Sequence, residues 1–270
     1  MAKFVKGTLL AGVVSLAIGS VASAQLTDAE FRCQRKVNKA GSDFVKSKMK
    51  CVSRCMTNAR NGLNPLSYCF PPYGGSTLTC ITEQTFRKGA EEKFSDAIRK
   101  SCDPTFEAGT DCPECYSEGD CSLAREASDR VQNVEGQLDS FVPGAYCDQP
   151  AADDAETACE QNTVKTIVKF IGSLNKCYDK CNRDARRGLI DPSSCMPPAT
   201  DPKTAACINK AAGKSIAGID RKCGDVGAIP DCTGIDDYPD GATWTNLFDV
   251  WFSGNVPGTY CASPSRAFLD

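Results

Sequence analysis

Hydrophobic residues and cysteines recur every three or four positions along most of the chain, with polar residues between them. The first such stretch contains no proline from about residue 28 to 61, and Val37, Phe44 and Cys51 share its inner face. Gly62 follows it, and glycine readily takes the left-handed conformation that ends a helix. The pattern predicts one long helix here, opened by a capping box at Thr27 and Glu30.

The same periodicity predicts five more helices, at about residues 77–100, 122–141, 154–187, 202–222 and 243–252. Proline-rich turns separate some of them, because proline fixes φ and disfavours helix at the preceding residue. Asp201 is placed to cap the helix that begins with Pro202. Alternation typical of strands appears over no useful length, so the predicted fold class is all-α.

The chain repeats its own pattern. A shift of 126 positions places Cys33, Cys51, Cys55 and Cys69 on Cys159, Cys177, Cys181 and Cys195 without a gap. The later cysteines keep their order with small changes of spacing. This pattern predicts a tandem duplication of a disulfide-stapled three-helix module, with one repeat in residues 25–150 and the other in residues 151–270.

The first 24 residues have the features of a secretory signal peptide. Lys3 and Lys6 precede an apolar run from residue 9 to 21, and Ala22-Ser23-Ala24 resembles a cleavage site. The run is shorter than the roughly 20 apolar residues that span a bilayer. We therefore expect an exported protein, periplasmic or extracellular, without a membrane span, whose 18 cysteines pair in an oxidising compartment.

Helix geometry narrows the possible cysteine pairs. Cysteines at i and i+4 of a helix are too far apart to bond to each other, so each needs a partner elsewhere. In an antiparallel hairpin, helical rise places the early cysteines of one helix beside the late cysteines of the next. The predicted pairs are Cys33–Cys102, Cys51–Cys80, Cys55–Cys69, Cys112–Cys147, Cys115–Cys121, Cys159–Cys223, Cys177–Cys207, Cys181–Cys195 and Cys232–Cys261.

Composition disfavours several kinds of chemistry. The chain has no histidine, which excludes His-containing zinc sites and Ser–His or Cys–His nucleophiles. Without the predicted signal it holds 29 basic and 34 acidic residues, so nucleic-acid binding is not expected. Cys112 and Cys115 have redox spacing, yet Cys112 has a structural counterpart in Cys232, which favours a structural role. No catalytic residue, metal site or cofactor is predicted.

Charge is unevenly distributed along the chain. The first predicted helix is basic, with Lys46, Lys48 and Lys50 among its cations, whereas residues 103–154 are acidic. Two solvated faces are the simpler interpretation, since exposed ion pairs contribute little. The alternative is head-to-tail contact between molecules.

The last predicted helix carries the candidate contact surface. Its apolar face is wider than that of the helix at 122–141, because Trp244, Leu247 and Trp251 stand where the earlier helix has polar residues. These side chains either fill volume within the module or form a surface for a partner or ligand.

The expected function is a binding or structural role, with self-assembly as one form of it, and not catalysis. Two alternatives stay open. One is a carrier of small apolar ligands between the helices. The other is binding of a soft metal, Cu(I), through unpaired cysteines.

Overall fold

The computed structural model describes residues 28–82, 88–102, 125–146 and 154–223, together with residues 242, 243 and 245. Every regular element among them is helical, as predicted for the fold class. The α-helices are α1 (Asp28–Arg60), α2 (Gly75–Ile81), α3 (Ala90–Cys102), α4 (Arg125–Tyr146), α5 (Asp154–Arg186) and α6 (Pro202–Cys223). Two 3₁₀ helices, η1 (Leu66–Cys69) and η2 (Pro192–Cys195), follow α1 and α5.

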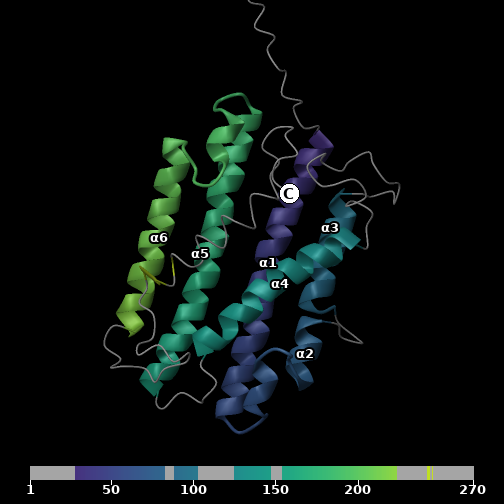
Figure 1. Cartoon of the computed structure of the whole chain (residues 1–270), viewed down its shortest axis with the longest axis vertical. Coiled ribbons are helices and arrows are strands. Elements are labelled where there is room, and N and C mark those ends of the chain that lie inside the picture. Colours follow the sequence, from purple (N-terminus) through teal and green to yellow (C-terminus); the bar gives the residue numbers. More distant parts are fainter. Residues whose placement is uncertain are drawn as a thin grey trace, which may run out of the picture.

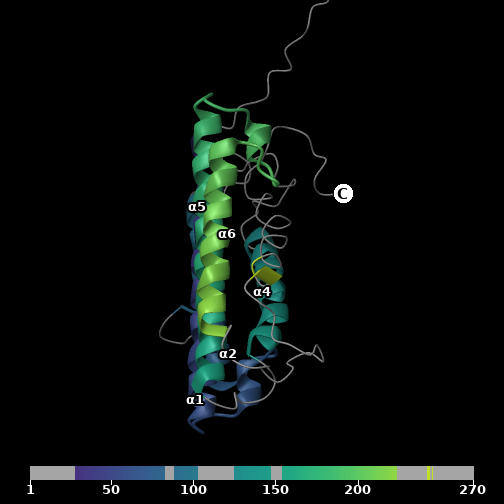
Figure 2. The same cartoon turned by 90° about the vertical axis from the view of Figure 1, so that its left-hand side faces the viewer.

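The long helices lie side by side in one layer. Figure 1 shows α6, α5, α1 and α3 in that order, with their axes along the length of the molecule. Figure 2 shows α4 on one side of this layer, where it contacts α1, α3 and α5. The other side of the layer carries no helix among the described residues.

The two longest helices end in the same way. Gly62 and Gly188 follow α1 and α5 with φ of 68° and 71°. The next residues, Leu63 and Leu189, donate their backbone N–H groups to carbonyls five residues earlier, at 2.8 and 3.0 Å. This is the Schellman arrangement, which glycine favours because it has no Cβ. The predicted helix ends are therefore correct to within one residue.

The helix predicted over 77–100 is wrong as one element, since the structure has α2 and α3 in its place. The backbone of Gly89 lies so close to Thr82 that a Cβ there would sit 2.2 Å from the Thr82 carbonyl oxygen. The residue before α3 therefore lies next to the residue after α2. Glycine at this position is required by the contact.

The predicted end of α4 near residue 141 is also wrong, because α4 continues through Pro143 to Tyr146. Val142, Ala145 and Tyr146 are buried at this end. Their packing in the core favours continuation of the helix, although proline supplies no N–H group to it.

One buried core joins the helices of the layer to α4. It contains apolar residues of α1, α3 and α4 together with Ile167, Phe170 and Leu174 of α5 and Ile219 of α6. Phe44 of α1 stacks on Phe94 of α3 with ring centroids 5.4 Å apart. No helix of the described residues is long and apolar enough to cross a membrane.

Candidate functional site

Six disulfides determine how the helices and loops are joined in the described part of the chain. Their S–S distances lie between 1.92 and 2.08 Å. The pairs are Cys33–Cys102, Cys51–Cys80, Cys55–Cys69, Cys159–Cys223, Cys177–Cys207 and Cys181–Cys195. They coincide with six of the nine predicted pairs. The other three, Cys112–Cys147, Cys115–Cys121 and Cys232–Cys261, lie outside the described residues.

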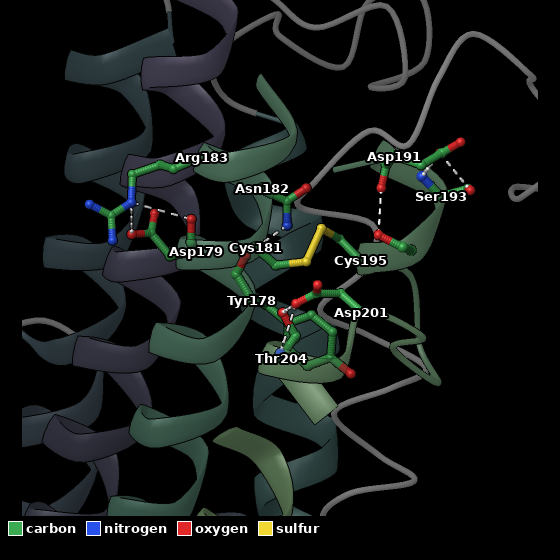
Figure 3. The surroundings of a disulfide bond; sticks show 11 residues. Tyr178, Asp179, Cys181, Asn182, Arg183, Asp191, Ser193, Cys195, Asp201 and Thr204 are labelled. Carbon is green, nitrogen blue, oxygen red and sulfur yellow. Dashed lines mark hydrogen bonds and ion pairs between the residues drawn. A yellow bond between two sulfur atoms is a disulfide. The ribbon is translucent and has the colours of Figure 1, made fainter. Parts of the chain in front are cut away.

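The loop after α5 shows how one of these disulfides is supported. Cys181 and Cys195 are both buried and join α5 to η2 (Figure 3). Beside them, Asp201 accepts hydrogen bonds from the backbone and hydroxyl groups of Thr204 at 2.8 and 2.7 Å, which caps α6 as predicted. These bonds favour the carboxylate and hold the pKa of Asp201 below its usual value.

A buried lysine lies at the centre of the most unusual polar cluster. Lys48 of α1 points into the core and its side chain has no exposed area. Its Nζ lies 2.5 Å from Oε1 of Glu135 and 2.6 Å from Oδ1 of Asp139, both on α4. The hydroxyl of Tyr73 donates to the same Asp139 oxygen at 2.6 Å, and Lys48 Nζ is 5.0 Å from the centre of the Tyr73 ring. We call these residues, with Glu91, the Lys48 cluster.

The cluster perturbs the acidity of its members. Burial raises the pKa of Glu91 to about 7, and the neighbouring Glu135 carboxylate adds to the shift. Burial and the Asp139 carboxylate also raise the pKa of Tyr73, so its phenol stays protonated and donates. The cluster therefore combines Lys48 with three acidic side chains, of which Glu91 has a pKa near neutral pH.

The arrangement holds α4 against α1 and the loop before α2. A buried ammonium group requires charged partners. The two partners of Lys48, Glu135 and Asp139, reach it only when α4 lies in its observed position. Sequence analysis missed this cluster and grouped Lys48 with the surface cations of its helix. One signal in the sequence could have indicated this burial. The shift of 126 aligns Lys48 with Leu174, an apolar residue that is fully buried in the structure.

A second polar cluster joins α1 to α5. Arg60 near the end of α1 forms an ion pair with Glu160, whose side chain has no exposed area. Burial raises the pKa of Glu160 to about 8, although the attraction of Arg60 opposes the shift. Tyr146 at the end of α4 lies close by and shares a 2.7 Å hydrogen bond with the hydroxyl of Ser53. Within the described residues, Oε1 of Glu160 has no hydrogen-bond partner.

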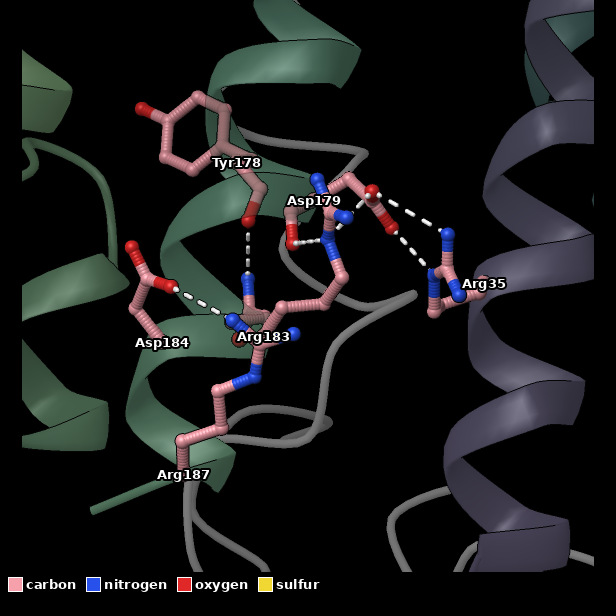
Figure 4. Close-up of polar contacts among 7 residues, drawn as sticks. Arg35, Tyr178, Asp179, Arg183, Asp184 and Arg187 are labelled. Carbon is pink, nitrogen blue, oxygen red and sulfur yellow. Dashed lines mark hydrogen bonds and ion pairs between the residues drawn. The ribbon is translucent and has the colours of Figure 1, made fainter. Parts of the chain in front are cut away.

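Exposed ion pairs complete the contact between α1 and α5. Asp179 of α5 lies between two arginines (Figure 4). It accepts from Nε of Arg35 at 2.7 Å and lies 3.2 Å from Nε of Arg183. Arg186 pairs with Asp28 and stacks over Phe31, with its Cζ 4.8 Å from the ring centre. Such exposed pairs contribute little each, but they define the register of the two helices.

The structure does not place the predicted contact surface, because Trp244, Leu247 and Trp251 lie outside the described residues. No group of His, Cys, Asp or Glu that could hold a metal ion is found in the part of the chain that the structure describes. Comparison with known proteins gives no match: no family model, curated protein or solved structure is similar to this chain.

Proposed function

We propose that this chain is an exported, disulfide-stapled helical scaffold that acts by binding or by a structural role. The signal peptide predicted at residues 1–24 would direct it to a compartment that oxidises thiols. The observation that carries the proposal is the use of the cysteines. All twelve described cysteines lie in disulfides. They fix helix positions instead of offering thiolates for chemistry.

We also propose that the scaffold arose by duplication of one module. The support lies in matching elements at the shift of 126. The helices α1 and α5 have 33 residues each. The disulfides of each half span similar numbers of residues, namely 69, 29 and 14 in the first half and 64, 30 and 14 in the second. Unrelated segments would have no reason to share this spacing.

A thiol count tests the scaffold proposal. The protein is purified from an oxidising compartment, treated with an alkylating reagent under denaturing conditions, and weighed by mass spectrometry with and without prior reduction. We expect no alkylation before reduction and eighteen alkylated cysteines after it, together with loss of residues 1–24. Many free thiols in the native protein would refute the scaffold and favour the Cu(I) alternative.

A further inference from the structure

The side of the helix layer opposite α4 carries a continuous band of positive charge. On α1 the exposed positions recur at steps of three and four residues and hold seven cations. Arg35 pairs with Asp179 of α5, and the other six are Arg32, Lys36, Lys39, Lys46, Lys50 and Arg54. They lie on the face of α1 opposite the buried Lys48. The same stripe holds one exposed carboxylate, that of Asp43, which pairs with Lys39 at 2.7 Å.

The neighbouring helix extends this band. The exposed positions of α5 between Ala158 and Lys180 include four lysines, Lys165, Lys169, Lys176 and Lys180, and no acidic residue. Lys169 lies on the face of α5 opposite the buried Glu160, which approaches Tyr146 of α4. The stripes of α1 and α5 therefore point to the same side of the layer. We call the ten side chains together the cationic face.

The cationic face is large enough for a stable protein contact. From Arg32 to Arg54 the helix rises about 33 Å. Two adjacent helices about 10 Å wide then give an area of about 660 Å², close to the roughly 800 Å² that each partner buries in a typical complex. Like charges at adjacent turns destabilise a helix. A partner that neutralises them would remove this cost.

The chain itself contains acidic segments that complement this face. Residues 103–124 include six acidic and no basic residues, and residues 224–241 include five acidic and no basic residues. Residues 103–124 end where α4 begins, at Arg125, and α4 lies on the opposite side of the layer. Residue 103 follows Cys102, which is bonded to Cys33 of α1, so the chain path permits contact within one molecule as well as between molecules, and the mixed-isotope cross-links described below distinguish the two.

We propose that the cationic face binds the acidic segments of a second copy of this chain. The proposal deepens the scaffold function and rests on it. The disulfides join α1 and α5 each to the neighbouring elements of its own half, and ion pairs between α1 and α5 hold the two stripes side by side. The contact joins two different surfaces, so it can extend from copy to copy instead of closing as a symmetric dimer. Its strength should fall with salt, because a Debye length of about 10 Å at 0.1 M screens exposed charges.

The test is sedimentation velocity of the full-length, oxidised protein in 20 mM and 500 mM sodium chloride. Association should appear at low salt and disappear at high salt. Lys46→Glu with Lys50→Glu reverses two charges one turn apart and should weaken association at least about tenfold, since like charges then face each other. Lys210→Glu with Lys214→Glu is the matched control on α6, with the same spacing and charge change, and should alter association less than twofold.

Cross-linking identifies the partner surface. A mixture of ¹⁴N- and ¹⁵N-labelled protein is treated with a carbodiimide, which joins lysines directly to carboxylates in contact. We expect mixed-isotope links from Lys46 or Lys169 to residues 103–124 or 224–241. A monomer at low salt, links only within one molecule, or equal loss in the α6 control would overturn the proposal. A monomer that binds anionic vesicles through this face would also overturn it. The thiol count tests the scaffold proposal separately, so failure of one proposal can be distinguished from failure of the other.

Discussion

Replacing Lys48 with methionine should destabilise the protein strongly, because it removes the only described cation of a buried cluster. The change leaves Glu135 and Asp139 without their ammonium partner. Removing one partner of a buried ion pair typically costs about 3–5 kcal/mol. The side chains of Glu135 and Asp139 are 22% and 26% exposed, so water can solvate them in part and reduce this destabilisation.

We therefore expect Lys48→Met to lower the free energy of unfolding by about 2–3 kcal/mol. For a chain of this size that corresponds to a fall in Tm of about 5–10 °C. The deficit should be larger at pH 8 than at pH 5. At the lower pH, Glu91, whose pKa burial raises to about 7, is protonated and adds no negative charge to the cluster.

The assay is urea unfolding of the oxidised protein, followed by circular dichroism at both pH values. Lys50→Met, two residues further along and exposed, is the control and should change stability by less than about 0.5 kcal/mol. Lys48→Met combined with Glu135→Gln and Asp139→Asn should recover most of the loss at pH 5, because Glu91 is then protonated and no unpaired charge remains. If Lys48→Met were as stable as the parent at pH 8, the proposed role of the cluster would be wrong.

Three further predictions concern other parts of the chain. Folding raises the pKa of Glu160 from 4.5 to about 8, so stability should fall as pH rises between those values, by at most about 1.4 kcal/mol per pH unit. Glu160→Gln should remove that slope in urea unfolding, and an unchanged slope would contradict the assignment. Replacing Cys115 and Cys121 with serine should lower Tm only slightly, because the predicted loop is short, whereas replacing Cys51 and Cys80 should lower it much more. Equal effects would count against the pairing. Blue-shifted, quencher-resistant emission from the two tryptophans would show that they are buried and would exclude the predicted contact surface.

Local features of the sequence were enough to predict most of the helices. Gly62 and Gly188 mark the ends of α1 and α5, and the positions of Cys33 and Cys51 along α1 indicate which cysteines of the hairpin lie beside them. These signals depend on helical rise and on the conformational freedom of glycine, both of which can be read from spacing alone. The predicted pairs among the described cysteines follow from the same geometry.

Features that depend on contacts distant in sequence were missed. Between α2 and α3 the backbone of Gly89 lies close to that of Thr82, and periodicity cannot show such a close approach. The Lys48 cluster brings together residues up to 91 positions apart. The charge of Lys48 favours the surface in any local interpretation, so its burial becomes visible only when α4 supplies its partners.

Differences between equivalent positions of the two halves indicate why α4 occupies one particular position. Under the proposed duplication, Lys48 corresponds to Leu174 and Glu160 corresponds to Gln34, so each of these two buried ionisable side chains occurs in one half only. Both clusters also approach α4, one through its carboxylates and the other through Tyr146. Buried ionisable groups tolerate misplacement poorly, because a shifted helix leaves them without hydrogen-bond and ion-pair partners. They therefore select one position for α4, on one side of the layer, while the cationic lysines and arginines occupy the other side. Because the two polar clusters hold α4 on one side of the helix layer, the opposite side, which carries the cationic face, is left without a covering helix among the described residues.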